Sequence, residues 1–600
     1  MQAVILAAGM GSRLGKYTRN NTKCMLGING RTLIERALDA LDAAGIRKCF
    51  IVAGYEKDNL IGFVGSRYKN IGITYIINDI YNKTNNIYSL YLAKDRLLED
   101  DTILLESDII FEDRIIGDLI RRPEPTLAVV ARYESWMDGT VVQISGGNVI
   151  TQIIPRKFFR YDQKESYYKT VNIYKFSRDF LRNSYVPFLD AYSKAMGSNE
   201  YYEQVLRVIV ALDKSELKAM VLDDHRWYEI DDVQDKDIAE TIFCDDPDEQ
   251  FRLIGRRYGG YWRFPKMLDF CYLVNPYFPT VQMRNEMEAC FRDLLTEYPS
   301  GLDVLNLLAG KMFNMEAPHI LAGNGASELI RALAPLVRGK TGIVYPSFNE
   351  YAESIKTEIV PLYPDNISYT ADDLAAWSER CDNLLLINPD NPSGNYIGEP
   401  ELRRLLRFLG DRGKTLILDE SFADFSGAEN CSLLSGETLA AFPNLVVIKS
   451  LSKSYGIPGI RLGVLASGNA GLVAQVRGNL PIWNINSFAE YFLQIMGKYT
   501  GDYRAACRLI AEERDRFGAE LEKTGLFTVY PSRANYFLCR RRNGTARELA
   551  VYLLARNVFI KDLSGKQGLD GPSWLRLAVR NRADNDTLIE KLSRFGGASS

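Results

Sequence analysis

The sequence predicts an α/β protein made of two enzymatic domains joined in one chain. Its 600 residues exceed the length of one ordinary hydrophobic core. Short apolar runs that suit buried strands alternate with segments of helical periodicity over most of that length. A glycine-rich loop follows the first apolar run, at residues 9–13, and a second polar centre, residues 449–461, lies far downstream. Because each centre lies in its own stretch of alternating elements, we predict two separate active sites.

Composition sets the class of protein. A hydrophobic content of 46% and a charged content of 25% are typical of a soluble globular protein. The formal net charge of −3 gives no general attraction to nucleic acid or to an anionic membrane surface. Nine cysteines without a CxxC pair favour reduced thiols and a cytoplasmic location. No apolar run approaches the ~18–20 residues of a membrane span, and only two histidines argue against histidine-based triads and metal sites.

Residues 1–242 predict a three-layer domain with a mainly parallel sheet. Between the first two apolar runs, residues 32–43 (TLIERALDALDA) place apolar side chains at helical spacing. Strands that alternate with helices favour this architecture, in which ligands bind beyond the carboxyl ends of the strands. The candidate strands are residues 4–8, 48–53, 73–77, 102–105 and 126–131.

The glycine-rich loop is the candidate triphosphate site. Small residues at Gly9, Gly11 and Ser12 let backbone N–H groups turn inward around an anion. Arg13 and Lys23 then add fixed positive charge to the same concavity. We therefore expect the first strand to lead directly into a site for a nucleoside triphosphate.

Two carboxylates are the candidate ligands of Mg²⁺. Asp108 follows the strand at residues 102–105, and Asp231 lies within Trp227–Asp235, before a predicted helix. Carboxylates from separate strand ends can hold one hard cation against a triphosphate. Taken singly, each aspartate also suits a purely structural role, because an aspartate after a strand often caps a turn or a helix.

Together these motifs resemble the sugar-nucleotidyltransferase-like family, and more narrowly the bacterial phosphocholine cytidylyltransferases of cell-surface decoration. The resemblance covers residues 1–242 and rests on LAAGMGSRL, Lys23, Asn78–Tyr81, Asn85–Leu92 and Tyr228–Asp235. It implies CTP as substrate and Mg²⁺ on Asp108 and Asp231, with Lys23 and Arg13 as catalytic residues. One departure is Thr22, which stands where the family usually has proline. The implied nucleotide-binding residues are Leu6, Ala8, Gly9, Gly11, Ser12, Arg13, Lys23, Asn78 and Asn86.

The acceptor pocket has three weaker candidates. Glu203, in the segment 199–203 (NEYYE), supplies a hydrogen-bond acceptor for a primary ammonium, although the same segment also suits an exposed helix start. Trp136 and Glu229 are candidates of similar standing. After this domain, residues 243–265 shift from acidic to basic and aromatic, which favours a linker that leads into residues 266–600.

Residues 266–600 again alternate helices and strands and carry a second ordered set of motifs. Alone, GNGAS and NPDNPSG would suit ordinary turns, and a Ser-Lys-Ser stretch would suit a solvated loop. Their order resembles the fold-type-I pyridoxal-phosphate enzymes of the class I/II aminotransferase family, near histidinol-phosphate aminotransferase and threonine-phosphate decarboxylase. The motifs are residues 322–328 (AGNGASE), 345–348 (YPSF), 388–394 (NPDNPSG), 416–422 (LILDESF), 449–461 and 574–580 (WLRLAVR).

The resemblance assigns roles to nine positions around pyridoxal 5′-phosphate and one toward the substrate. Lys453 supplies the amine that binds the cofactor covalently, and Asp419 keeps the pyridinium nitrogen protonated. Arg576 binds a substrate carboxylate bidentately. The remaining cofactor contacts are Asn391 at O3′, Phe348 on the ring, and Ala326, Ser327, Ser450, Ser452 and Arg461 at the phosphate. Fold-type-I enzymes generally dimerise, so we expect a homodimer through this domain.

Joining the two activities predicts the substrate. Transamination of phosphonoacetaldehyde gives 2-aminoethylphosphonate, whose phosphonate oxygen can attack CTP and release pyrophosphate, as in the phosphonate-tailoring cytidylyltransferases. The second domain departs from the aminotransferases at Phe422, where a tyrosine is usual. This leaves an alternative open: phosphoserine decarboxylation followed by cytidylylation of phosphoethanolamine, with phosphocholine as a further acceptor. A third reading, in which one domain is an inactive scaffold, conflicts with the full motif sets in both halves. The amino donor, channelling between the sites and the final recipient of the head group stay undetermined at this level.

Overall fold

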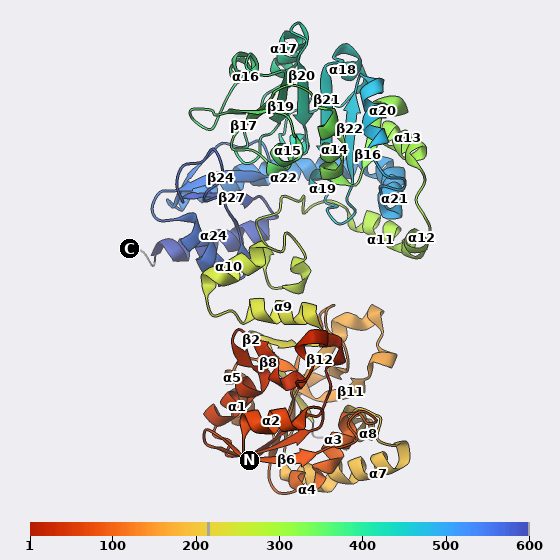
Figure 1. Cartoon of the computed structure of the whole chain (residues 1–600), viewed down its shortest axis with the longest axis vertical. Coiled ribbons are helices and arrows are strands. Elements are labelled where there is room, and N and C mark those ends of the chain that lie inside the picture. Colours follow the sequence, from red (N-terminus) through yellow and green to blue (C-terminus); the bar gives the residue numbers. More distant parts are fainter. Residues whose placement is uncertain (213–216, 598–600) are drawn as a thin grey trace. The chain divides into compact units, whose positions relative to one another are not determined.

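The computed structural model describes residues 1–212 and 217–597, which fold as two compact units, Met1–Arg263 and Phe264–Ser600 (Figure 1). Both units are α/β. Within the described ranges, no helix is long and apolar enough to cross a membrane.

The first unit is built on one mixed sheet. Its centre runs in the order β7-β1-β4-β6, and every neighbouring pair there is parallel. The flank is mixed, because β12 pairs antiparallel with β7, β9 and β10 while β13 pairs parallel with β9. The expected mainly parallel sheet is therefore correct only for the centre. The strands are β1 (Gln2–Ala7), β4 (Lys48–Ala53), β5 (Arg67–Tyr68), β6 (Ile71–Ile77), β7 (Thr102–Glu106), β9 (Leu127–Arg132), β10 (Val141–Ile144), β11 (Ile150–Ile154), β12 (Tyr168–Phe176) and β13 (Lys218–Leu222).

Alternate residues of β1 belong to different cores, which makes the unit three-layered. Ala3, Ile5 and Ala7 pack into a cluster with α1 (Leu33–Ala43), α2 (Lys57–Val64) and α5 (Arg114–Arg121). Val4 and Leu6 pack into a second cluster with α3 (Asn86–Leu92), α7 (Val186–Met196) and α8 (Glu203–Ala211). Side chains that alternate between two faces of a strand produce this arrangement when both faces are covered by helices.

The segment between the two units is helical rather than an extended linker. Asp246 accepts hydrogen bonds from the backbone N–H groups of Asp248 and Glu249 and so starts α10 (Pro247–Gly255), with a proline in its first turn. A short 3₁₀ turn, Tyr261–Arg263, ends the first unit. Most of residues 243–265 thus belongs to the first unit, and the boundary falls after Arg263.

The second unit has a large sheet in the order β16-β22-β21-β20-β19-β17-β18, in which only the pairs of β22 are antiparallel. Leu384, Leu386, Leu416 and Leu418 face one hydrophobic cluster, and the intervening Leu385, Ile387 and Ile417 face another. A smaller antiparallel sheet, β23-β24-β27-β26, follows. The strands are β16 (Ile320–Gly323), β17 (Thr341–Val344), β18 (Ile359–Leu362), β19 (Asn383–Ile387), β20 (Thr415–Asp419), β21 (Leu445–Ser450), β22 (Gly463–Ser467), β23 (Phe527–Val529), β24 (Tyr536–Arg541), β26 (Lys561–Asp562) and β27 (Trp574–Ala578).

Helices cover the faces of the large sheet and extend the second unit (Figure 1). They include α11 (Val281–Ala289), α12 (Phe291–Thr296), α13 (Leu302–Phe313), α14 (Gly325–Leu333), α15 (Asn349–Ser354), α16 (Ala371–Ser378), α17 (Glu399–Gly410), α19 (Leu451–Ser454), α20 (Ala470–Gly478), α21 (Ser487–Ile495), α22 (Thr500–Lys523), α23 (Ala546–Leu554) and α24 (Arg582–Gly597).

Candidate functional sites

The glycine-rich loop follows β1 and closes onto Lys23. Gly11 has a φ of +59°, and a Cβ added there would lie 3.1 Å from the Cβ of Lys23. Only glycine adopts this backbone without strain and leaves room for the lysine. Thr18 Oγ1 donates to the Gly11 carbonyl at 3.0 Å and fixes the turn. Ser12 and Arg13 begin a short 3₁₀ helix after the loop, and the flanking Leu6 and Ala8 are buried.

Lys23 lies between the two candidate metal ligands. Its Nζ is 2.8 Å from Oδ2 of Asp108 and 2.9 Å from Oδ1 of Asp231. Arg13 contacts the same Asp231 oxygen at 2.9 Å. Burial alone disfavours the ammonium, but attraction to the two carboxylates raises the pKa of Lys23 well above its usual value. Likewise, burial opposes ionisation of Asp231, but Lys23 and Arg13 hold its pKa below the ordinary range.

The donor set here fits Mg²⁺. Oδ1 of Asp108 is buried and has no hydrogen-bond partner, so one acceptor-only oxygen is left for a cation. Across the part of the chain that the structure describes, no group of three or more His, Cys, Asp or Glu side chains has a metal-binding arrangement. Two carboxylates are nevertheless sufficient for Mg²⁺, which completes its shell with water and substrate phosphate oxygens.

The side chains of Asn78 and Asn86 make hydrogen bonds within the fold. Asn78 is buried and donates to Thr84 Oγ1 at 3.2 Å and to Ser89 Oγ at 3.1 Å. Asn86 donates to Oε1 of Glu106 at 2.8 Å, and its Oδ1 accepts the backbone N–H of Tyr202 at 3.0 Å. Both side chains therefore have partners inside the fold, and their contact with the nucleotide stays a prediction.

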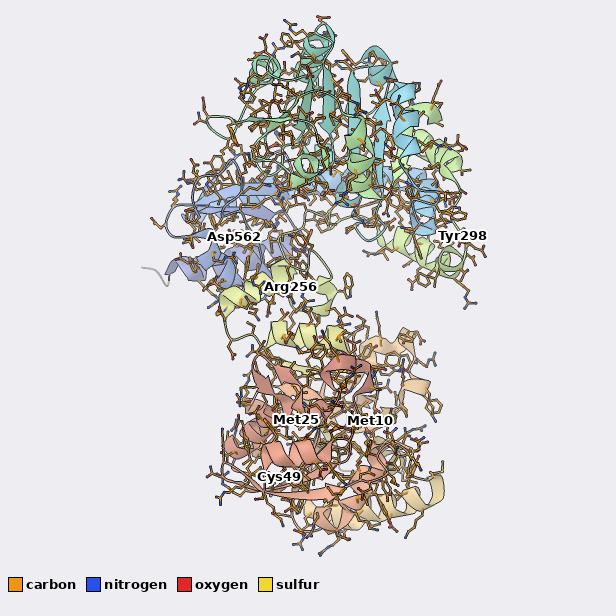
Figure 2. All side chains as sticks on the ribbon, in the orientation of Figure 1. Met10, Met25, Cys49, Arg256, Tyr298 and Asp562 are labelled. Atoms are coloured by element: carbon orange, nitrogen blue, oxygen red, sulfur yellow. The ribbon has the colours of Figure 1, made fainter. Side chains whose placement is uncertain are left out.

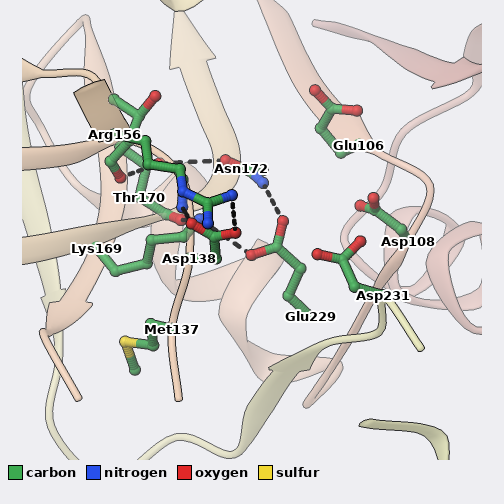
Figure 3. A network of polar contacts seen from close by, with 12 residues as sticks. Glu106, Asp108, Met137, Asp138, Arg156, Lys169, Thr170, Asn172, Glu229 and Asp231 are labelled. Carbon is green, nitrogen blue, oxygen red and sulfur yellow. Dashed lines mark hydrogen bonds and ion pairs between the residues drawn. The ribbon is translucent and has the colours of Figure 1, made fainter. Parts of the chain in front are cut away.

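A cluster of acidic side chains, which we call the acidic pocket, adjoins the two aspartates; Glu203 is buried, whereas Glu106 and Glu229 are half-buried. In Figure 3 the carboxyl groups of Glu106, Asp108, Glu229 and Asp231 lie near one another. Glu229 pairs with Lys169 at 3.1 Å, where the lysine side chain is only 2% exposed, and also accepts a hydrogen bond from Asn172 at 3.2 Å. The pocket thus holds several acids around one buried lysine.

The pKa values in the acidic pocket are raised first by burial and then by neighbouring carboxylates. Burial raises the pKa of Glu203 to about 7, and burial together with the neighbouring carboxylates raises the pKa of Glu106 and Glu229. Three polar atoms nearby are buried without a hydrogen-bond partner: Oε2 of Glu203 and the hydroxyls of Tyr174 and Tyr202. Unpaired acceptors of this kind are costly in a protein interior and mark a place for a donor ligand.

Trp136 lies beside this pocket. Its ring stacks on that of Tyr228 with centroids 4.1 Å apart and tilts against Trp227 at 5.7 Å. Its Nε1 donates to Glu134 at 2.5 Å. Tyr228 and Trp227 lie in β14 (Trp227–Glu229), the strand that also carries Glu229.

The second site surrounds Lys453, in the short helix α19 after β21. Lys453 is half-buried, and desolvation lowers its pKa, as do the positive charges of Arg576 and Arg461, against the attraction of Asp419. A lysine with a lowered pKa supplies the neutral amine that covalent chemistry needs. Asp419, at the end of β20, accepts the Tyr351 hydroxyl at 2.8 Å and the Ser421 backbone N–H at 2.9 Å.

A phosphate-binding region lies at the start of α14, where Ala326 and Ser327 occupy the first turn. Gly325 has a φ of +75°, and a Cβ there would lie 2.7 Å from Nη2 of Arg461. This close approach requires glycine. Oγ of Ser452 is buried without a partner, and Ser450 accompanies it at the end of β21. A helix N-terminus, a guanidinium and unpaired hydroxyls fit a phosphate group.

The remaining predicted cofactor and substrate residues lie around the same centre. Arg576 donates to Oδ1 of Asn391 at 2.6 Å, and burial lowers its pKa. Phe348 is 39% exposed and so presents an open ring face. Lys453 Nζ lies 5.2 Å from the ring centroid of Phe422. A tyrosine at position 422 would add a hydroxyl to this ring. The residues present therefore fit pyridoxal 5′-phosphate, with one donor fewer than a tyrosine would give.

Comparison with known proteins identifies the family. A family model for aminotransferase class I and II matches residues 280–592, more than half of the chain. The chain belongs to the aminotransferase class I and II family. A MobA-like NTP transferase domain model matches residues 3–167, so this family member also carries an N-terminal nucleotidyltransferase domain.

Relatives share either the whole chain or its aminotransferase-like part. CMP-5'-(3-aminopropyl)phosphonate synthase of Streptomyces rubellomurinus is 31% identical over 100% of this chain and 95% of that protein. L-serine phosphate decarboxylase of Campylobacter jejuni is 30% identical over 54% of this chain and 87% of that protein. The crystal structure of histidinol-phosphate aminotransferase from Clostridium acetobutylicum is 28% identical with a TM-score of 0.51, and the match covers 55% of this chain and all of that one.

Several residues at these sites escaped the sequence analysis. Lys169 and Glu106 carry no motif, and Tyr351 lies six residues beyond the YPSF segment's start without a recognisable pattern. Each meets its partner only through pairing of distant strands or helix packing. The available signal for the first site was a lysine and an asparagine, Lys169 and Asn172, within a short β-branched and aromatic run that was not predicted as a strand.

Proposed function

We propose that this protein is a bifunctional enzyme whose first unit transfers CMP from CTP to 2-aminoethylphosphonate, with release of pyrophosphate. The observation that carries the proposal is Lys23 held between Asp108 and Asp231 at the end of the glycine-rich loop, directly beside the acidic pocket. The first group of residues suits a metal-bound triphosphate, and the second suits a small cation. An amino-phosphonate meets both requirements, because it carries an anionic phosphonate that attacks the triphosphate and a small ammonium group.

The first reaction needs positioning and charge neutralisation rather than a general base. A phosphonate oxygen of the acceptor attacks the α-phosphorus of CTP, and the bond to the β,γ-pyrophosphate breaks. A dianionic phosphonate is already a competent nucleophile. Lys23 and Arg13 stabilise the charge that develops on the phosphoryl oxygens. Asp108 and Asp231 would hold Mg²⁺, which neutralises triphosphate charge when bound.

The acidic pocket binds the amino group of the acceptor. A primary ammonium has three N–H donors, and Oε2 of Glu203 with the hydroxyls of Tyr174 and Tyr202 are the unpaired buried acceptors nearby. Trp136 and Glu229 complete the predicted acceptor site. A trimethylammonium group offers no N–H donor and would leave these atoms unsatisfied, so the pocket favours a primary amine over choline.

For the second unit we propose aminotransfer from an amino acid to phosphonoacetaldehyde, which forms the acceptor used by the first. Pyridoxal phosphate, when bound, supplies the electron sink for this chemistry. Lys453 would hold it covalently and move the substrate proton, Asp419 would keep its ring nitrogen protonated, and Arg576 would bind the donor's carboxylate. The full-length likeness to an aminopropylphosphonate-conjugate synthase supports an amino-phosphonate product.

A second candidate for this unit is decarboxylation of phosphoserine to phosphoethanolamine. Two observations favour it: the missing hydroxyl at Phe422 beside Lys453, and the 30% identity to an L-serine phosphate decarboxylase. Phosphoethanolamine carries the same primary ammonium, so the acidic pocket suits either product. Demand for an amino donor would support aminotransfer, whereas release of CO₂ would support decarboxylation.

We also propose that the second unit forms a homodimer. Its helices α12 and α13 and the loop before α21 expose a group of large apolar side chains; Tyr298, labelled in Figure 2, is 78% exposed and stacks on Trp483 at 4.5 Å. Exposed apolar groups of this size mark interaction surfaces. The other members are Phe291, Leu295, Leu307 and Ile482.

The deciding experiment measures pyrophosphate release from CTP and Mg²⁺ with 2-aminoethylphosphonate, phosphoethanolamine and phosphocholine at equal concentrations. A preference for 2-aminoethylphosphonate supports the proposal. A preference for phosphoethanolamine supports the decarboxylase alternative, and a preference for phosphocholine contradicts the link between the two units. Borohydride reduction followed by mass spectrometry tests the second site, because pyridoxal phosphate should become fixed to Lys453 and not to a Lys453→Ala variant.

A further inference from the structure

The last residue of the first unit is anchored beside the cytidylyltransferase site. Arg263 directs one nitrogen, Nη2, at two groups: Oδ1 of Asp235 at 2.8 Å and the Tyr228 hydroxyl at 2.7 Å. The side chains of Arg263 and Asp235 are only 17% and 14% exposed. A charge-assisted contact with this burial is stronger than an ordinary surface ion pair.

Asp235 in turn fixes the backbone that carries a predicted metal ligand. Its Oδ2 accepts the N–H of Asp231 at 3.0 Å and the N–H of Asp232 at 3.2 Å. The second of these bonds is part of the capping box that begins α9 (Val233–Ile242). The adjacent Ile230 N–H donates to the carbonyl of Asp108 at 2.9 Å. The position of Asp231 relative to Asp108 therefore depends on the place of the Asp235 carboxylate.

Tyr228 links Arg263 to Trp136, a predicted acceptor-binding residue. Its hydroxyl is held by Arg263, and its ring is the stacking platform of Trp136 at 4.1 Å. Tyr228 is almost fully buried and precedes Glu229 in β14. The Arg263 guanidinium thus contacts two side chains. Asp235 supports the backbone of the predicted metal ligand Asp231, and Tyr228 supports the indole of Trp136, a predicted acceptor-binding residue.

We propose that Arg263 is a positioning residue for cytidylyl transfer, which sets the Asp108–Asp231 pair through Asp235 and the Trp136 platform through Tyr228. The inference rests on the proposed function of the first unit. Because Phe264 opens the second unit, the segment that joins the two enzymes ends in a contact on which the first active site depends. Neither family model assigns a role to this residue, since the models cover residues 3–167 and 280–592.

The test compares three full-length variants with the wild type. Arg263→Met keeps the aliphatic stem but loses the charge, and Arg263→Lys keeps a charge that reaches one partner at a time. Arg257→Met is the matched control. Arg257 lies six residues earlier in the same segment, is 14% exposed and pairs with Asp237. Asp237 has no described contact with Asp231 or Tyr228. Binding of Mn²⁺ to the enzyme with CTP, without acceptor, is read from the electron paramagnetic resonance of free Mn²⁺.

We expect Arg263→Met to weaken Mn²⁺ binding about 10-fold, as substitutions behind metal ligands do, and to raise the KM of the acceptor. Arg263→Lys should show a smaller loss, and Arg257→Met should match the wild type even if its melting temperature falls equally. Equal Mn²⁺ binding in Arg263→Met and wild type would overturn the inference alone. So would equal weakening in Arg263→Met and Arg257→Met. If Arg263→Met fails to fold, full activity in a folded Arg263→Lys variant would also overturn it. A wild type that binds no Mn²⁺ with CTP would instead overturn the proposed function itself.

Discussion

Replacing Glu203 with glutamine should change how the stability of the first unit depends on pH. Burial raises the pKa of Glu203 from 4.5 to about 7 in the folded protein without ligand. The folded state therefore binds this proton more tightly than the unfolded chain does, and its contribution to stability falls as pH rises from about 4.5 to 7. Between pH 5 and pH 8 this loss is about 2.5 kcal/mol, since one pKa unit corresponds to about 1.4 kcal/mol.

Glutamine has nearly the same shape as glutamate and no charge to bury, so the stability of the Glu203→Gln variant should not fall by this amount as pH rises. The melting temperature of Glu203→Gln relative to wild type should rise by about 5 °C between pH 5 and pH 8, at roughly 2 °C per kcal/mol for a unit of this size. Differential scanning calorimetry of the full chain measures it, and the transition of the first unit is identified by its shift with CTP and Mg²⁺.

Glu200→Gln is the control, because it makes the same chemical change three residues earlier at a less buried position. A constant difference between Glu203→Gln and wild type from pH 5 to pH 8 would refute the reasoning about this pocket. The same variant should also bind the amino-phosphonate acceptor less well, because it loses the negative charge that faces the ammonium.

Three further predictions concern both sites. Lys23→Met should lower kcat for pyrophosphate release by about 10²–10³ while Lys16→Met, in the same segment but exposed, has little effect; similar losses in both would remove Lys23 from the mechanism. Tyr351→Phe deletes the 2.8 Å hydrogen bond that orients the Asp419 carboxylate, so the pyridoxal-phosphate-dependent rate should fall about 10-fold, with cytidylyl transfer unchanged; an unaltered rate would contradict a positioning role for Tyr351. Phe422→Tyr adds an O–H donor near Lys453. Because this donor stabilises the phenolate oxygen of the bound cofactor, the pH midpoint of the cofactor's absorbance change should move downward. An unmoved midpoint would show that the new hydroxyl does not reach the cofactor.

Local sequence patterns predicted many of the elements of the first unit. The strand expected at residues 48–53 is β4, and the helix expected from residue 32 is α1, which begins after Thr32 because that residue and Glu35 form a capping box. Apolar periodicity and caps are properties of neighbouring residues and are therefore readable. The antiparallel pairs of the flank were not predicted, because β12 meets β7 across a sequence distance that no local pattern encodes.

The same limit applies to the sites. Lys23, Asp108 and Asp231 come together as their motif order predicts. Asp108 follows β7 of the main sheet, whereas Asp231 follows β14, which pairs with β8 (Ile109–Phe111) in a separate two-stranded sheet. Glu106 and Lys169 lie within or at the ends of strands that read as structural, and their role emerges only when β7 and β12 pair. The motif that contains Asn78 and Asn86 gave no sign of their hydrogen bonds to Ser89 and Glu106, because those partners are set by the fold.

The separation of the hydrophobic clusters bears on how the chain is made. Each of the four large clusters described above draws its residues from one unit only. The clusters of the first unit are complete by Trp227, before any residue of the second has been synthesised. Since domains generally fold as units during synthesis, with the N-terminal one first, the nascent nucleotidyltransferase domain can bury its apolar surface while the ribosome is still translating the rest. Early burial keeps that surface from associating with the unfinished second half of a 600-residue chain.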